Sequence, residues 1–376
     1  MMDIQKSRTW AEIDLSALEH NYNALRTLVP PQCRLLFPVK SDAYGHGALS
    51  IARRLEQLGA DYLAVASLEE GIELREEGIS LPILVLGGTA PIWTEALIHY
   101  QLTQGIFDEN SAFAFSAAAQ RLGQKLKAHI KIDTGMSRLG FLCDEENMKK
   151  TAETVKRIYA LPGMYWEGIF THFSCSDIDE HYTMLQFTRF LSLLDILKEQ
   201  GINFEIRHCA ASAAVLNYPC TYLDMVRPGL ALYGHYPSDE CKRPGHLDLI
   251  PLMTLKTRVV SVKTVPSGTP VSYGGTHILD RDSRLAILGI GYGDGLPRSC
   301  SNRMNVWWNG KELPLLGSIC MDLCMADANC APELQPGDEV ELFGPHIPVE
   351  TVARLAGTIQ YEILCGINKR VPRLYV

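Results

Sequence analysis

The feature that most constrains the fold is an alternation of short apolar runs with longer amphipathic ones, which continues to about residue 235. Eight short runs are rich in Val, Ile, Leu or Phe, which is typical of strands buried on both faces. They cover residues 35–39, 62–66, 83–86, 103–107, 129–133, 168–173, 204–208 and 223–226. Eight β–α repeats predict an α/β fold in which the N-terminal domain is a (β/α)8 barrel.

The intervening segments carry helix signals. Apolar residues recur at three- and four-residue spacing in residues 179–200, where Asp179 favours the N-terminus and Gly201 ends the helix. A second helix is predicted for residues 68–77, before Gly78. A doubly wound open sheet is the alternative architecture, but it needs a glycine-rich turn after the first strand, and none is present.

After about residue 247 the pattern changes, because strand-like runs follow one another without long helices between them. They cover residues 255–264, 285–290, 305–308, 313–316 and 339–343. Asn309-Gly310 predicts a tight hairpin, and residues 349–356 form the one helical stretch. We therefore predict two domains, a barrel over residues 1–245 and a C-terminal mostly-β domain over residues 246–376.

The composition excludes several classes of protein. The 43 acidic and 35 basic residues give a net charge of −8, with no basic stripe for nucleic acid. No apolar run is long enough for a membrane helix, and no secretory signal is evident. The 11 cysteines include no CxxC pair and no zinc-like spacing, which predicts reduced thiols, no metal site and a cytoplasmic location.

Polar residues follow the strand ends that would form the mouth of the barrel, where barrel enzymes place their chemistry. They are Lys40, Arg138, His172, His208, Ser212 and Arg227. A partly desolvated lysine such as Lys40 can form a Schiff base, although a plain surface lysine would also fit this position. Gly229 and its neighbours could offer N–H groups to a phosphate, with a hydroxyl from Ser212, which could equally be a helix cap.

Two further patterns need an interpretation. Lys131 and Asp133 alternate along one predicted strand and therefore share a face, where a buried ion pair involving Asp133 or Arg138 would offset their charge. The glycines of residues 289–295 imitate a dinucleotide fingerprint, but Asp294 breaks the spacing and no helix follows. We interpret them as turn glycines.

Residues 40–47, KSDAYGHG, resemble the pyridoxal-phosphate attachment motif of the alanine racemase family. The resemblance extends in order and spacing over essentially the whole chain. It includes residues 10–18, 131–141, 168–173, 227–234, 271–274, 289–295, 317–322 and 358–373.

The resemblance implies a pyridoxal 5'-phosphate enzyme in which Lys40 holds the cofactor covalently. The phosphate would be surrounded by Tyr44, Ser212, Gly229, Leu230 and Tyr292. Arg227 would face the pyridine nitrogen, and Arg138 would contact the cofactor's phenolic oxygen and the substrate carboxylate. Lys131 matches a lysine that is carbamylated in many members, which would replace its positive charge with a negative one.

The resemblance also implies a two-base mechanism, with Lys40 acting on D-alanine and Tyr273 acting on L-alanine from the opposite face. His172, stacked toward Arg227, would assist. Tyr273, Tyr292 and Met321 would enter the site from the partner subunit, so that a homodimer is required. The usual task of the family is to supply D-alanine for peptidoglycan.

Several positions depart from the common pattern of the family: Ala211, Phe170, Leu323 and Lys369. The change at Lys369 could alter the pocket, and an apolar pocket rejects an added hydroxyl only weakly. A serine or broad-specificity racemase is therefore the alternative function. A cofactor carrier without racemase activity would usually lack Tyr273 and the second domain, and a decarboxylase would carry a different phosphate loop.

Overall fold

The computed structural model describes residues 7–242 and 247–376, and these residues form two compact units. The barrel unit comprises Leu18–Ala43 and Ala48–Ile250, and the β unit comprises Met1–Ala17, Tyr44–Gly47 and Pro251–Val376. The domain boundary predicted between residues 245 and 246 lies outside the described residues. The units differ from the predicted domains in two ways. Residues 44–47 and the described part of residues 1–17 belong to the β unit, and residues 247–250 belong to the barrel unit.

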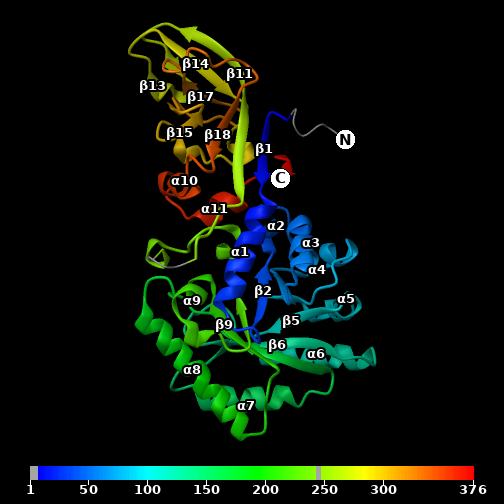
Figure 1. Cartoon of the computed structure of the whole chain (residues 1–376). Helices are drawn as coiled ribbons and strands as arrows, with labels where there is room; N and C mark the ends of the chain where they lie inside the picture. Colours follow the sequence, from blue (N-terminus) through cyan, green and yellow to red (C-terminus); the bar gives the residue numbers. More distant parts are fainter. Residues whose placement is uncertain (1–6, 243–246) are drawn as a thin grey trace. The chain divides into compact units, whose positions relative to one another are not determined.

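The predicted barrel is confirmed, because eight parallel strands among the described residues form a closed ring. They belong to the part of the chain coloured from blue to green in Figure 1. The order is β5-β4-β3-β2-β10-β9-β8-β6, and pairing of β5 with β6 closes it, which excludes the open sheet. The strands are β2 (Arg34–Pro38), β3 (Tyr62–Val65), β4 (Ile83–Val85), β5 (Leu102–Ile106), β6 (Leu126–Asp133), β8 (Met164–Phe170), β9 (Ile206–Ala211) and β10 (Met225–Arg227).

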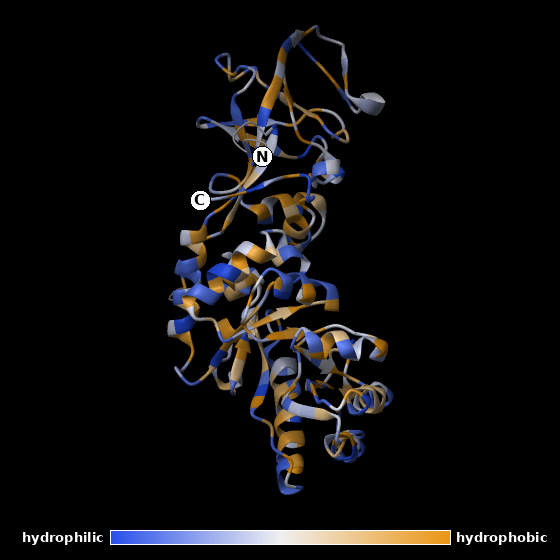
Figure 2. Cartoon of the chain, turned by 90° about the vertical axis from the view of Figure 1, so that its right-hand side faces the viewer, coloured by the Kyte–Doolittle hydropathy of each residue, from blue (hydrophilic) through white to orange (hydrophobic). Residues whose placement is uncertain are grey.

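Helices connect successive strands and mix hydrophobic and hydrophilic residues, as amphipathic helices on a barrel should (Figure 2). They include α3 (Ala48–Leu58), α4 (Leu68–Glu76), α5 (Thr94–His99), α6 (Glu109–Arg121), α7 (Met148–Tyr159), α8 (Glu180–Glu199) and α9 (Ser212–Asn217). The predicted start and end of α8 are confirmed. The Asp179 carboxylate accepts a hydrogen bond from Tyr182 N–H, and Gly201 adopts a left-handed φ of 78°.

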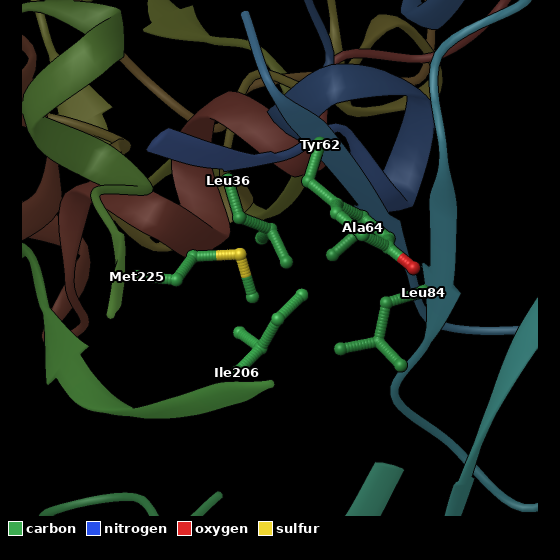
Figure 3. Close-up of a cluster of buried hydrophobic side chains, with 6 residues drawn as sticks. All are labelled: Leu36, Tyr62, Ala64, Leu84, Ile206 and Met225. Carbon is green, nitrogen blue, oxygen red and sulfur yellow. The ribbon is translucent and has the colours of Figure 1, made fainter. Parts of the chain in front are cut away.

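The barrel interior is filled by side chains from alternating strand positions, so it is a packed core. One cluster brings together side chains from five strands (Figure 3). Its members are Leu36, Tyr62, Ala64, Leu84, Ile206 and Met225, none more than 2% exposed. This apolar packing supports the polar side chains that other strands direct inward.

The β unit is organised around the long strand β11 (Met253–Val265), which pairs with β1 (Thr9–Ile13), β14 (Ser283–Leu288) and β18 (Glu339–Phe343). Other elements are β12 (Pro270–Val271), β13 (His277–Ile278), β15 (Asn305–Trp308), β16 (Lys311–Pro314), β17 (Cys324–Asp327), β19 (Arg373–Tyr375), α10 (Val349–Ala356) and α11 (Gln360–Cys365). The predicted mostly-β character is confirmed.

Two local features of the β unit differ in how well the sequence indicates them. The β15–β16 hairpin turns at Asn309 and Gly310, both with positive φ as predicted. By contrast, β1 was not predicted, although it pairs antiparallel with β11 and parallel with β19. In the described part of the chain, no helix combines the length and apolar character needed to cross a membrane.

Candidate active site

Lys40 begins α2 (Lys40–Tyr44), a single turn of left-handed helix just beyond the end of β2. Ser41, Asp42, Ala43 and Tyr44 all have φ between 52° and 55°. A left-handed conformation costs an L-residue roughly 1–2 kcal/mol, and non-glycine residues rarely adopt it in series. Strain of this kind is characteristic of functional sites, where the surrounding structure holds the backbone in place.

Arg227 ends β10 inside the barrel, and its guanidinium is held by four groups. Nη1 donates to His208 Nδ1 at 2.8 Å, and Nη2 donates to the carbonyls of Thr171 and Cys209 and, at 3.2 Å, to His172 Nδ1. Burial lowers the pKa of Arg227 to about 10, so the group remains a cation at neutral pH. His172, which the resemblance places against Arg227, is joined to it in the structure by this hydrogen bond.

Several cations surround His172. Burial, followed by the charges of Lys131, Arg227, Arg138 and Lys40, holds the pKa of His172 well below its usual range, so the imidazole is neutral. Burial and the nearby charges of Arg227 and Arg138 likewise lower the pKa of Lys131, against a smaller opposing effect of Asp133. The structure therefore gathers four basic side chains near one point of the barrel.

The expected ion pair of Lys131 is wrong. Within the described residues Lys131 forms no ion pair, and its Nζ lies 4.7 Å from the centre of the Phe170 ring. The Asp133 carboxylate instead accepts hydrogen bonds from the backbone N–H groups of the following loop. The donors are Gly135, Met136 and Ser137. Local backbone donors outcompeted the side chain two residues away, and they shape the loop that carries the exposed Arg138.

Arg227 is also connected to a buried network of hydrogen-bonded side chains that was not predicted from the sequence. His208 Nε2 lies 2.9 Å from His129 Nδ1, and His129 Nε2 lies 3.0 Å from the Glu167 carboxylate. Arg227 can only donate and an ionised Glu167 can only accept, so both imidazoles must be neutral with the proton on Nε2. Lys127 and Tyr62 also donate to Glu167, at 2.9 and 2.8 Å.

His129 and Glu167, two members of this network, differ in how far the sequence could have predicted them. His129 lies two residues before Lys131 in β6, so the same alternation that placed Lys131 inside could have placed His129 there. Glu167 reaches the interior only because the β6–β8 register shifts at Ala128/His129. Gly168 is also required, since a Cβ there would lie 2.7 Å from the His129 ring.

Ser212 is the first residue of α9 and lies beside the loop after β10. Its Oγ accepts hydrogen bonds from Gly229 N–H at 2.9 Å and Ala231 N–H at 3.2 Å. Ala211 is the residue that precedes the helix, and the Ser212 hydroxyl does not cap it. The structure thus joins Ser212 to the Gly229–Leu230 turn, where its hydroxyl already accepts the Gly229 N–H, and excludes the simple helix-cap interpretation.

The β unit holds the remaining predicted residues on neighbouring loops. Tyr292 N–H donates to the Cys320 carbonyl and Gly293 N–H to the Met321 carbonyl. The loop before Tyr273 is joined to the same loop between β16 and β17, since Ser272 Oγ donates to the Ser318 carbonyl at 2.6 Å. The side chains of Tyr273, Met321 and Tyr292 are 73%, 54% and 43% exposed.

Tyr44 belongs to the β unit, where its ring lies 5.9 Å from that of Tyr361. Burial raises the pKa of Tyr44, so its phenol remains protonated. Residues 40–43 of the predicted cofactor motif thus belong to the barrel unit, and residues 44–47 belong to the β unit.

An eight-stranded barrel with a lysine after its first strand, a buried arginine–histidine cluster and a β unit of this kind defines a two-unit barrel enzyme. The family model of the alanine racemase N-terminal domain matches residues 13–237, and that of the C-terminal domain matches residues 252–375. The chain belongs to the alanine racemase family.

The similarity to individual relatives extends over nearly the full length of the chain. The chain is 45% identical to the alanine racemase of Desulforamulus reducens over 99% of this chain and 100% of that protein. It is 45% identical to that of Desulfovibrio desulfuricans over 98% of each. The alanine racemase structure from Clostridium difficile 630 superposes with a TM-score of 0.94 at 38% identity, covering 99% of this chain and 96% of the other.

Proposed function

We propose that this protein is a pyridoxal-phosphate-dependent alanine racemase that interconverts L- and D-alanine. The observation that carries the proposal is the gathering of basic groups around His172 and Arg227, next to a lysine held on a strained turn. The length and identity of the match to alanine racemases support alanine as the substrate. A solved relative from Bacillus anthracis is described with bound L-Ala-P.

The residues present fit an anionic cofactor. Four basic side chains act on His172, whereas Asp133 directs its carboxylate to its own loop. Such a surplus of positive charge suits the phosphate and phenolic oxygen of the cofactor and the carboxylate of an amino acid. Contacts to the cofactor are proposed for Lys40, Tyr44, Arg138, His172, Ser212, Arg227, Gly229, Leu230 and Tyr292. Bound pyridoxal phosphate supplies an electron sink that acidifies the α-hydrogen of the amino acid.

Racemisation requires a base on each face of the α-carbon. We assign Lys40 Nζ to the D face and the phenolic oxygen of Tyr273 to the L face, with Arg138 and Met321 binding the substrate. Because Tyr273 and Met321 are exposed, we propose that they serve the site of a second copy in a homodimer. Arg227, a buried cation, disfavours a proton on the pyridine nitrogen that it would face.

Two finer proposals concern Lys131 and the biological role. Burial and the charges of Arg227 and Arg138 lower the pKa of the Lys131 amine, which favours the neutral form that reacts with carbon dioxide to give a carbamate. A carbamate would place a negative charge beside Arg138 and Arg227. We further propose that the enzyme acts in the cytoplasm and supplies D-alanine for peptidoglycan, without a nucleic-acid or membrane partner.

The decisive test follows loss of optical activity of L-alanine and L-serine in parallel, with purified protein and added pyridoxal phosphate. We expect faster loss for alanine, and Lys40→Ala as the inactive control. Faster loss for serine would support the broad-specificity alternative and direct attention to Lys369 and Leu323. No loss for either amino acid would refute the racemase proposal.

A further inference from the structure

The Glu70 carboxylate, which has no role in the proposed mechanism, bridges two backbone segments. Its Oε1 accepts a hydrogen bond from Ser41 N–H at 2.6 Å, and its Oε2 accepts one from Ala66 N–H at 2.7 Å. Ser41 is the first residue of the left-handed turn and directly follows Lys40. Ala66 directly follows β3, the neighbour of β2 in the barrel.

The position of Glu70 is fixed by α4. Ser67 precedes the helix, and its hydroxyl accepts a hydrogen bond from Glu70 N–H at 3.4 Å. Buried Leu68 and Leu74 anchor the helix to the barrel. An acidic residue in the first turn is also favoured by the helix dipole. The carboxylate is thus held at the strand ends that form the mouth of the barrel.

A role in helix capping does not account for both contacts. In a capping box, the third helical residue accepts a hydrogen bond from the residue that precedes the helix, which needs one carboxylate oxygen. Here Oε2 binds Ala66 N–H, one residue earlier, and Oε1 is left for Ser41, 29 positions away in the sequence. The second oxygen therefore joins α4 to the lysine-bearing turn.

Other contacts of this turn act further along it. Ala43 N–H donates to the Val39 carbonyl, and the Asp42 carboxylate accepts from Ala48 N–H at 2.8 Å, at the start of α3. Ser41 N–H is the first backbone donor after Lys40, and a charge-assisted bond there opposes relaxation toward the ordinary right-handed conformation.

We propose that Glu70 is a positioning residue that fixes the turn after β2 and thereby the direction in which Lys40 leaves the backbone. The proposal rests on the proposed function, in that Lys40 is taken as the group that holds the cofactor and moves the proton. Misplacement of a reacting group by about 1 Å can cost roughly 100-fold in rate, so a small backbone relaxation suffices for a large effect.

The test compares Glu70→Gln and Glu70→Ala with Glu69→Gln, a neighbouring exposed carboxylate that does not contact the turn. A glutamine side chain offers one acceptor oxygen and can retain only one of the two hydrogen bonds. Hydrogen exchange of the protein without added cofactor reads the turn directly. We expect faster exchange at Ser41 in both Glu70 variants, unchanged exchange in Glu69→Gln, and similar melting temperatures for all three.

A second measurement reads Lys40 itself. After addition of pyridoxal phosphate, absorbance and reductive trapping follow covalent capture by the lysine. We expect capture and kcat to fall roughly 10- to 100-fold in Glu70→Ala and less in Glu70→Gln, with a smaller change in KM for alanine. Unchanged Ser41 exchange, or altered exchange with normal capture and kcat, would overturn the positioning role. If the wild type neither captures cofactor nor racemises alanine, the proposed function fails, whereas the exchange result still decides whether Glu70 holds the turn.

Discussion

The predicted site residues of the barrel unit and those of the β unit differ in burial and in how their side chains are held. In the barrel, Arg227 is 4% exposed and its hydrogen bonds all go to groups of the same unit. In the β unit, the loops of Tyr273, Tyr292 and Met321 are held by backbone contacts, but their side chains are exposed. The barrel residues of the proposed site are thus held by buried contacts within their own unit. The residues of the β unit are exposed, which is consistent with their serving the site of a second copy of the protein.

The largest effect is expected from removal of the barrel's reactive amine. Lys40→Ala should reduce racemisation roughly 1,000-fold or more, because both covalent capture of the cofactor and one of the two bases are lost. Optical activity of L-alanine and the absorbance of bound pyridoxal phosphate provide the measurements. Lys125→Ala, which changes an exposed lysine of the same unit, should leave both unchanged. Substantial activity in Lys40→Ala would remove the lysine from its assigned role.

Tyr273→Phe tests the exposed residues that the β unit contributes to the proposed site. Racemisation should fall about 100-fold, because the phenolic hydroxyl is the proposed base for L-alanine. The equilibrium constant of racemisation is 1, so kcat/KM must fall equally in both directions. Exchange of the α-hydrogen with deuterium from the solvent separates the two bases. D-alanine should still exchange through Lys40, whereas L-alanine should not.

The exposed Tyr165, which bonds Glu205 in the barrel unit, offers a matched control in Tyr165→Phe. Equal exchange of both enantiomers in Tyr273→Phe would contradict the assignment of one base to each face. A monomeric protein that retains full activity would contradict the shared site, because the displayed tyrosine would then serve its own chain.

Variants of Glu167 test how much the buried hydrogen bonds of the barrel unit contribute to its stability. Burial alone would raise its pKa, but hydrogen bonds from His129, Lys127 and Tyr62 outweigh this effect and lower the pKa to about 2. Glu167→Ala should reduce the free energy of unfolding by roughly 3 kcal/mol, since it leaves buried partners unpaired. Denaturant unfolding measures the loss, and Glu205→Ala on the surface is the control.

The same residue predicts a pH dependence. Because the pKa of Glu167 is lower in the folded protein than its unfolded value of about 4.3, its ionised form stabilises the fold above pH 4. That contribution is lost as the pH falls from about 4 toward 2. Glu167→Gln should therefore flatten the loss of stability over this range, and an unchanged acid profile would show that the network contributes little.

The contrast between the units also explains what the sequence could predict. Buried parallel strands leave continuous apolar runs, so all eight barrel strands were recognised, and the mouth residues followed from the strand ends. Glu167 could not be predicted, because a register shift and the absence of a side chain at Gly168 bring it inside. Strand β1 was missed because the residues that it pairs with, in β11 and β19, lie at least 240 positions away in the sequence. Glu70 carries no signal beyond that of an acidic residue in the first turn of a helix.

The smallest predicted effect concerns the β15–β16 hairpin, where local turn chemistry rather than burial determines the structure. Gly310 has a φ of 81° and open space around the position of a Cβ, so only backbone strain opposes a side chain. Gly310→Ala should cost about 1 kcal/mol of unfolding free energy. Gly310→Asn should cost less, since asparagine tolerates the left-handed conformation better than alanine. Equal losses in the two variants would mean that strand pairing, rather than the conformation of the turn, stabilises the hairpin. Packing would then determine the structure here, as it does in the barrel.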